Sequence, residues 1–338
     1  MTEAVQPMLD MEAVINFEVS EEKPSELPAN NGKKQKEKPK RRPRASKTED
    51  SESFLRPKQV RKKPVMKLVP STNNEFAPFT YEEAHFLAGE IDKFMGTQID
   101  FEILSTIRYE PTLTAVSDPS QIVCPENFFL LKSHWQRLHL AIDFFKWDVE
   151  VPYELLVNEL MKAINQLDPM LPYKLRVLVT KNNVLRVEAH PTTPRIDLFS
   201  GVNNYPNLQP LDPVYKVYLD TQHTSISPFT SFKTTYRDHY TKSRQRILKN
   251  NGDLEEVLVY NTCNEIMEGS ISNVAFRRDD KWITPSLVSG CLCGVVRNTL
   301  LLAGIIEEGK ILRNSVKVGD EVVIFNGIMG VCYGRIAE

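Results

Sequence analysis

The sequence lacks any apolar run that approaches the roughly 20 residues needed to cross a bilayer, so a soluble protein is predicted. Cysteine is also scarce. The five cysteines are scattered and odd in number, which argues against a disulfide scaffold and for a reducing compartment. Cys291 and Cys293 form a Cys-x-Cys pair without a second ligand pair, so no metal site is predicted. The acidic N-terminus has neither the basic and apolar pattern of a signal peptide nor the Arg-rich pattern of a transit peptide, so no targeting peptide and a cytoplasmic location are expected.

Acidic residues are few between residues 33 and 67, where 15 Lys and Arg stand against 4 Asp and Glu. Residues 69–338 hold 26 Lys and Arg against 33 Asp and Glu. This mild acidity disfavours nucleic acid as a partner of the folded domains. Residues 1–75 are poor in aromatics and rich in Pro, Lys, Glu and Ser, which predicts a disordered tail. The basic run at 38–44 fits a solvated tail, the commoner case, or a nuclear-import or polyanion-binding patch.

The 338 residues, 41% of them hydrophobic, suffice for two domains with cores after this tail. Thr80 and Glu83 form a capping box that predicts a helix reaching about Met95. Apolar periodicity then predicts an α/β domain at 76–213, and a second domain is expected at 214–338. The expected elements are a strand at 101–109, helices at 133–145 and 153–167, a hairpin of strands at 173–180 and 184–190, and a strand at 214–219.

The segment 268–297 has the pattern of a functional site, with Glu-Gly-Ser-Ile-Ser-Asn at 268–273, Ile-Thr-Pro at 283–285 and Leu-Cys-Gly-Val-Val-Arg at 292–297. Glu268 is expected in a turn between two apolar strands, where folding alone needs no charge. Gly294 precedes a helix expected to end at Gly304, and a helix start offers free N–H groups to an anion. Arg297 fits equally well a position on the surface of that helix.

These three motifs, in this order and spacing, resemble the fold-type IV pyridoxal-phosphate enzymes. That family includes branched-chain and D-amino-acid aminotransferases and 4-amino-4-deoxychorismate lyase, and the resemblance covers roughly residues 100–338. It implies a two-domain α/β (α+β) fold, with a smaller N-terminal domain and a larger C-terminal pseudo-barrel domain that binds pyridoxal 5'-phosphate. It also implies a small-molecule substrate and a homodimer, since family members are commonly dimers.

The resemblance assigns roles to single residues, some of which would otherwise be read as surface positions. Lys233 stands where the family's Schiff-base lysine belongs. Arg137, in a His-x-x-Arg-Leu motif at 134–138, would bind the cofactor phosphate through its guanidinium fork. Glu268 would pair with the pyridine nitrogen and keep it protonated. The remaining expected cofactor contacts are the N–H groups of Val295 and Val296, the turn at Asn326, and, as second-tier candidates, Ser272 and Asn273.

These cofactor residues do not separate an aminotransferase from a lyase, so the substrate side has to decide. Aminodeoxychorismate carries two carboxylates, and Arg108 and Arg237 look like the arginines of the lyase branch. The resemblance therefore favours 4-amino-4-deoxychorismate lyase, which makes 4-aminobenzoate and pyruvate on the folate route. Arg108 fits equally well a solvent-exposed strand edge. A branched-chain or D-amino-acid aminotransferase and a non-enzymatic interaction protein are the alternatives.

The expected mechanism gives Lys233 the proton transfers. It would remove the proton from the amine-bearing ring carbon of the substrate and return one to the leaving enolpyruvyl group. Thr106 and Tyr109, on the first predicted strand, are weaker candidates for the second transfer. His134 and His139 flank Arg137 and are expected to be structural or surface histidines.

Overall fold

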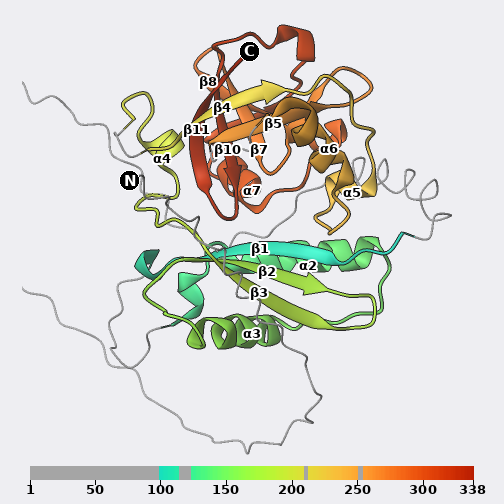
Figure 1. The fold of residues 1–338 in the computed structure, drawn as a ribbon, viewed down its shortest axis with the longest axis vertical. Helices are drawn as coiled ribbons and strands as arrows, with labels where there is room; N and C mark the ends of the chain where they lie inside the picture. The colour runs from blue at the N-terminus through green and yellow to red at the C-terminus, as the bar shows by residue number, and fades with distance from the viewer. Residues whose placement is uncertain (1–98, 114–122, 209–211, 250–253) are drawn as a thin grey trace, which may run out of the picture. The chain divides into compact units, whose positions relative to one another are not determined.

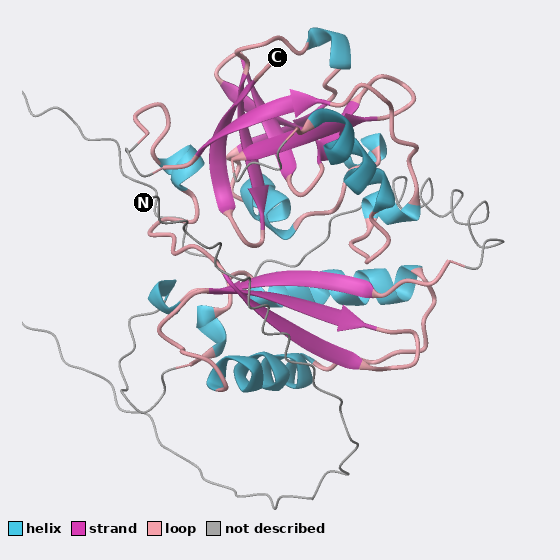
Figure 2. Ribbon diagram, in the orientation of Figure 1, coloured by secondary structure: helices cyan, strands magenta, loops and turns pink. Residues whose placement is uncertain are grey.

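The computed structural model describes residues 99–113, 123–208, 212–249 and 254–338. The predicted tail at 1–75 and the predicted helix from Thr80 to Met95 lie outside these residues. The described chain forms a three-stranded sheet and a curled eight-stranded sheet, seen as two separate groups of strands in Figure 2. No helix within these ranges has the length and apolar character needed to cross a membrane.

The small sheet is antiparallel, in the order β1 (Ile103–Tyr109), β2 (Tyr173–Val179) and β3 (Leu185–Pro191). Helices α2 (Leu131–Phe144) and α3 (Tyr153–Asn165) pack against it (Figure 1) and share one buried apolar core with its strands. All five elements were predicted from apolar periodicity, with ends shifted by no more than two residues. Short 3-10 turns lie before α2, at Pro111–Leu113 and Pro125–Asn127.

Side chains along the strands of the small sheet point alternately toward its apolar core and away from it. Ile107 lies opposite Leu175 on β2, and both belong to the core shared with the helices. Neighbouring residues of a strand point to opposite faces, so Thr106, Arg108 and Arg176 point away from that core and line a pocket. The small sheet therefore has one apolar face, which packs in the core, and one largely polar face, which lines the pocket.

The larger sheet has the strand order β6-β5-β4-β11-β10-β7-β8-β9. Strand β4 pairs in parallel with β5 and β11, β8 pairs in parallel with β9, and the other neighbours are antiparallel. Their bounds are β4 (Val214–Leu219), β5 (Glu255–Tyr260), β6 (Ile266–Gly269), β7 (Asn273–Arg278), β8 (Lys281–Pro285), β9 (Ile306–Gly309), β10 (Glu321–Asn326) and β11 (Gly330–Ile336).

This sheet curls until its two edges approach each other. The N–H of Ile266, on edge strand β6, donates to the carbonyl of Ile311 (2.8 Å), just beyond edge strand β9. The N–H of Arg313 donates to the carbonyl of Asn264 (2.8 Å) in the same region. A buried cluster with side chains from six of the strands fills the inside, and it includes Val217, Leu258, Ile266, Phe276, Ile324 and Cys332. The predicted C-terminal pseudo-barrel is therefore present as a half-barrel.

Helix α7 (Val295–Leu302) covers the outer face of this half-barrel. Along β10, Val322 and Ile324 point to the inner cluster while Val323 and Phe325 point to the outer cluster with α7. A strand buried on both faces reads as a continuous apolar run, which explains the Val-Val-Ile-Phe sequence. The remaining helices are α4 (Ser200–Asn203), α5 (Pro228–Ser231) and α6 (Asp238–Ile247), with 3-10 turns at Leu287–Ser289 and Arg313–Ser315.

Candidate active site

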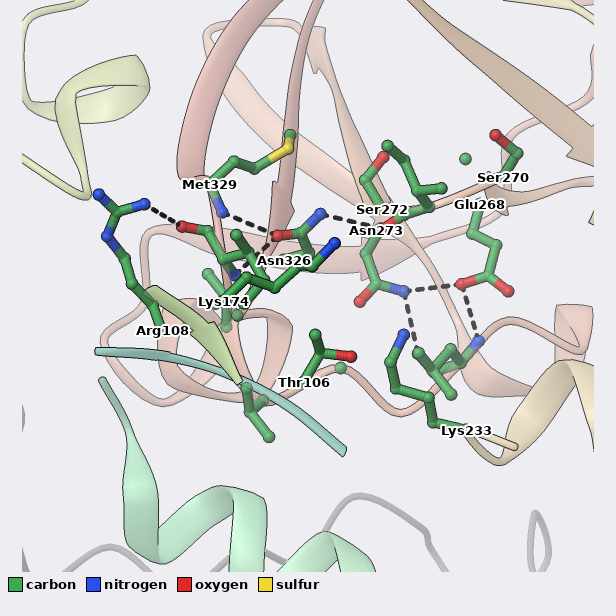
Figure 3. A pocket seen from close by; sticks show the side chains of 18 of the residues that line it. Thr106, Arg108, Lys174, Lys233, Glu268, Ser270, Ser272, Asn273, Asn326 and Met329 are labelled. Carbon is green, nitrogen blue, oxygen red and sulfur yellow. Dashed lines mark hydrogen bonds between the residues drawn. The ribbon is translucent and has the colours of Figure 1, made fainter. Parts of the chain in front are cut away.

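A pocket of about 1000 Å³ is lined by residues of both sheets. Strands β1 and β2 contribute their polar face, and most of the other lining residues lie in the segments 192–195, 229–240, 268–273, 292–296 and 326–329. Arg137, on helix α2, also lines the pocket. Figure 3 shows the Lys233 and Glu268 side chains at one end of the view and Arg108 at the other. The volume is that of a site for small molecules or cofactors.

Lys233 follows helix α5, and its backbone is hydrogen-bonded to the small sheet. The N–H of Leu104, on β1, donates to the carbonyl of Lys233 (2.9 Å). Burial lowers the pKa of the Lys233 ammonium well below its usual value, and the charges of Arg237 and Arg137 lower it further. Among the described residues, no carboxylate lies within ion-pair distance of the Lys233 amine. A lysine in this state can act as a nucleophile or a base.

Glu268 is 2% exposed and lies on strand β6, so the prediction that it sits in a turn is wrong. The turn begins one residue later, because the N–H of Gly269 bonds to the carbonyl of Ser272 (2.8 Å). The carboxylate accepts hydrogen bonds from the Tyr240 hydroxyl, from Asn273 Nδ2 (3.2 Å) and from the N–H of Leu292 (3.0 Å). Burial raises the pKa of Glu268 to about 7, although Tyr240, Leu292 and Lys233 act in the opposite direction.

Arg137 is a buried cation without a carboxylate partner in the described part of the chain. Its Nη2 donates to Ser105 Oγ (3.1 Å), and that hydroxyl lies 2.8 Å from His134 Nδ1. Arg137 Nη2 also lies 3.5 Å from His134 Nδ1. Because arginine only donates, Nδ1 acts as an acceptor there and takes the Ser105 proton as well. Burial, and then the charges of Arg137 and Lys233, lower the pKa of His134 well below its usual value and keep the ring neutral. His134 is therefore structural, and the charge of Arg137 needs an anion from outside the chain.

The start of helix α7 supplies further donors for that anion. The N–H groups of Val295 and Val296 are in its first turn, where no intrahelical acceptor exists. Gly294, the residue before them, leaves a space that a side chain would fill, because a Cβ there would lie 1.8 Å from Asn273 Oδ1. Arg137, Val295 and Val296 all line the pocket, as a phosphate site requires.

Three predicted cofactor contacts line the pocket but direct their side chains to the protein. Ser272 Oγ donates to Glu256 (2.6 Å). Asn273 Nδ2 donates to Glu268 and to the carbonyl of Leu292 (2.9 Å), so it supports Glu268. Asn326 Nδ2 donates to the carbonyl of Ile271 (3.0 Å), and its Oδ1 accepts from two N–H groups of its own turn. These side chains shape the wall of the pocket.

Glu256 and Tyr240 were missed in the sequence analysis. Glu256 is fully buried on β5 and holds the loop after β6. It accepts from the hydroxyls of Ser270 and Ser272 (both 2.6 Å) and from the N–H groups of Ser270 and Ile271. Glu256 follows Glu255 at the start of β5, so its sequence position resembles that of an exposed strand end and gave no signal of burial.

The two arginines predicted to bind the substrate differ in their surroundings. Arg108 is 1% exposed, which excludes the solvent-edge alternative, but it pairs with Glu110 (2.6 Å) and donates to two backbone carbonyls. Arg237 has no carboxylate partner in the described residues; its Nη2 donates to the Ser270 carbonyl (2.8 Å). Further basic residues that were not predicted also line the pocket: Lys174, Arg176 and Arg195.

Two possibilities that the sequence left open are excluded by the structure. Tyr109 belongs to the core of the small sheet, where its hydroxyl donates to the carbonyl of Pro169 (2.8 Å), so it is not a proton donor in the pocket. Arg297 is 2% exposed and donates to the carbonyl of Pro285 (2.8 Å), so it is not on the helix surface. Thr106, by contrast, does line the pocket.

The family model of the class IV amino-transferases matches residues 121–333. This span contains Arg137, Lys233, Glu268 and the start of α7. The chain belongs to this family. This class IV protein is 35% identical over 267 residues to aminodeoxychorismate lyase of Saccharomyces cerevisiae, covering 65% of this chain and 70% of that protein.

Solved structures of class IV proteins have the same fold. One is from Mesorhizobium loti, provisionally described as an amino-acid aminotransferase, with a TM-score of 0.56 and 23% identity over 70% of this chain and 100% of that one. Another is the branched-chain amino acid aminotransferase of Escherichia coli, with a TM-score of 0.52 and 16% identity over 71% of this chain and 77% of that one. At such identities the likeness establishes the fold alone.

Proposed function

We propose that this protein is an aminodeoxychorismate lyase, which converts 4-amino-4-deoxychorismate to 4-aminobenzoate and pyruvate with pyridoxal 5'-phosphate as cofactor. The observation that carries the proposal is the charge of the pocket. Its lining holds seven Lys and Arg side chains and one carboxylate, that of Glu268. Burial favours the neutral amine of Lys233, and Arg108 and Arg176 pair with Glu110 and Glu188. Three lining arginines have no carboxylate partner in the described residues: Arg137, Arg195 and Arg237. One cofactor phosphate and two substrate carboxylates would match these three charges. The 35% identity to the yeast lyase supports the same substrate.

The residues of the pocket fit the cofactor. The unpaired charge of Arg137 and the N–H groups of Val295 and Val296 suit its phosphate. Glu268 suits its pyridine nitrogen, and Lys233 suits its aldehyde. When bound, pyridoxal phosphate supplies a carbonyl that takes up amines and a ring that accepts electron density.

In the reaction, the chain's own residues move the protons. Lys233 Nζ removes the proton from the ring carbon that carries the substrate amine, because its lowered pKa makes the free base available. The bond from the ring to the enolpyruvyl oxygen then breaks, and the ring becomes aromatic. The departing enolpyruvate needs one proton on its methylene carbon to become pyruvate. Lys233 returns that proton, with Thr106 as the weaker candidate on the opposite wall.

Arg237 and Arg108 are the proposed partners of the two substrate carboxylates. Arg237 is the stronger of the two, because no described carboxylate neutralises it. Arg108 needs its ion pair with Glu110 to open or to be shared. The five free thiols favour a reducing compartment, and we place the enzyme in the cytoplasm on the folate route, as a homodimer.

The deciding experiment gives the purified protein pyridoxal phosphate and 4-amino-4-deoxychorismate generated in place from chorismate and glutamine. We expect 4-aminobenzoate and pyruvate in equal amounts without an added keto acid. Lys233→Ala should reduce turnover by at least about a thousandfold, since it removes the base and nucleophile. If products appear only from amino acids and only with 2-oxoglutarate, the protein is an aminotransferase and the lyase proposal is wrong.

A further inference from the structure

Tyr240 is a buried tyrosine that the proposed reaction does not use. It lies on helix α6, is 6% exposed and lines the pocket. Its hydroxyl has two acceptors within reach, Glu268 Oε1 and the more distant carbonyl of Thr230 (3.5 Å). A hydroxyl has one proton to donate, and the closer, charged acceptor takes it. Tyr240 therefore donates to Glu268.

The hydrogen bonds of Glu268 leave room for one more donor, on a particular oxygen. Oε2 accepts from Asn273 Nδ2 (3.2 Å) and from the N–H of Leu292 (3.0 Å), while Oε1 accepts from Tyr240. A carboxylate has about four lone-pair sites, two on each oxygen. The remaining site is on Oε1, so a ligand N–H that pairs with Glu268 shares this oxygen with the Tyr240 hydroxyl.

Arg237 fixes the ring that carries this hydroxyl. Its guanidinium lies over the Tyr240 ring, 4.9 Å from the centroid, and its Nη2 is tied to the carbonyl of Ser270 (2.8 Å). A cation over the ring face withdraws electron density from the phenol and makes its O–H a better donor. The same arginine therefore faces the pocket and supports the Tyr240–Glu268 contact.

We propose that Tyr240 is a positioning residue that keeps Glu268 charged, so that the pyridine nitrogen of bound pyridoxal phosphate keeps its proton. This inference rests on the proposed function. A pyridine nitrogen paired with Glu268 would keep its proton only while the carboxylate is stabilised as an anion. Burial works against that anion, and the Tyr240 hydroxyl, the Leu292 N–H, Lys233 and Arg237 work for it. Loss of the hydroxyl moves the proton from the ring to Glu268.

The test is Tyr240→Phe, which keeps the ring under Arg237 and removes only the hydroxyl. Pyridoxal phosphate labelled with ¹⁵N at the ring is bound to wild type and variant, and the ring-nitrogen chemical shift is recorded. We expect the shift in the variant to move toward that of unprotonated pyridine, and the affinity for the cofactor to fall by about tenfold, as for one lost bond to a charged group. A merely structural tyrosine would leave the ring-nitrogen shift in place.

Tyr236→Phe is the matched control on the same segment. Tyr236 is 37% exposed, and its ring packs against Phe229 and His239, so its hydroxyl loss should change neither the shift nor the affinity. If the wild type binds pyridoxal phosphate and Tyr240→Phe gives the wild-type shift, the role of Tyr240 is refuted and the proposed function stands. If the wild type itself binds no pyridoxal phosphate, both proposals fail.

Discussion

Two groups in the pocket have pKa values displaced in opposite directions. Burial raises the pKa of Glu268 and lowers that of Lys233, and each displacement favours the neutral form. Such displaced pairs are typical of catalytic sites. Arg137, which cannot become neutral at ordinary pH, is a further buried ionisable group of the pocket, and an anion beside it would offset the cost of its burial.

The charge of Arg137 leads to a prediction about the cofactor phosphate. Arg137→Gln should weaken binding of pyridoxal phosphate by about ten- to a hundredfold, the cost of losing hydrogen bonds to a charged group. Binding of pyridoxal, which has no phosphate, should change little. Both affinities can be measured by absorbance titration. An equal loss for the two ligands would show that Arg137 does not bind the phosphate.

The pKa of Glu268 leads to a prediction about pH. The unfolded chain releases this proton near pH 4.5 and the folded chain near pH 7, so rising pH across that window favours unfolding. Glu268→Gln lacks this penalty. Relative to wild type, the free energy of unfolding of the variant apoprotein should therefore increase by roughly 3 kcal/mol between pH 4 and pH 8. Urea unfolding of both proteins measures it, and a pH-independent difference would contradict the assignment.

At the scale of elements, the loop after β6 and the start of α7 are held by one set of contacts. The Glu256 carboxylate holds the loop by accepting hydrogen bonds from the hydroxyls of Ser270 and Ser272. Asn273 then connects the loop to α7, because its Nδ2 bonds to the carbonyl of Leu292 (2.9 Å). The strand that carries Glu268 and the helix that offers the anion site are therefore positioned together.

A pair of glycines that flank α7 tests this connection. Gly294→Ala places a Cβ 1.8 Å from Asn273 Oδ1, so it should displace Asn273, weaken pyridoxal phosphate binding and cost about 1–3 kcal/mol of stability. Gly304→Ala meets nothing within 4 Å and should cost only about 1 kcal/mol, for its positive φ of +65°. Urea unfolding and cofactor titration compare the two. Equal effects on cofactor affinity would show that Asn273 is not the connection.

Several of these elements could be predicted from sequence because their patterns are local. The periodicity of α2 and α3, and the glycines around α7, follow from residues close in the chain. The ion pair between Arg108 and Glu110 was also within reach, since residues two apart on a strand share a face.

Contacts between distant segments could not be predicted in this way. Tyr240 bonds to Glu268, which lies 28 positions further along the chain. Glu256 bonds to Ser270 and Ser272, which lie 14 and 16 positions further along. No spacing rule links residues so far apart on different elements. Glu268 lies on a strand because residues 266–269 pair with β5. A segment of four residues is too short for its sequence pattern to indicate that pairing. The roles of the site residues, and the domain bounds at 76–213 and 214–338, are predictions that the experiments above address.

At the scale of the whole molecule, charge is separated. Residues 69–338 are mildly acidic, with 26 Lys and Arg against 33 Asp and Glu, but the pocket is strongly basic. A basic pocket in an acidic surface concentrates field lines and attracts small anions to one place. The basic lining consists of Arg108, Arg137, Lys174, Arg176, Arg195, Lys233 and Arg237.

This separation predicts a salt dependence. Raising KCl from about 0.02 to about 0.5 M shortens the Debye length from roughly 20 Å to about 4 Å. The KM for the dianionic substrate should therefore rise severalfold, while kcat changes little because contacts inside the pocket are less screened. Steady-state kinetics measures both constants, with choline chloride as a second salt to exclude a specific effect of potassium. A KM that is flat in salt would refute electrostatic recognition.

The backbone around Lys233 is hydrogen-bonded to the start of strand β1 in the small sheet. Leu104 donates to the carbonyl of Lys233, and Thr235 and Glu102 exchange further bonds across the same junction (2.9 Å each). Strand β1 also presents Thr106 and Arg108 to the pocket. This one strand therefore positions both the Lys233 amine and two side chains proposed to face the substrate. A slip of β1 by one residue would move the lysine and exchange the selecting side chains for core residues. The position of the Lys233 amine and the side chains that face the substrate are therefore coupled through β1, and a change in the register of this one strand would alter both.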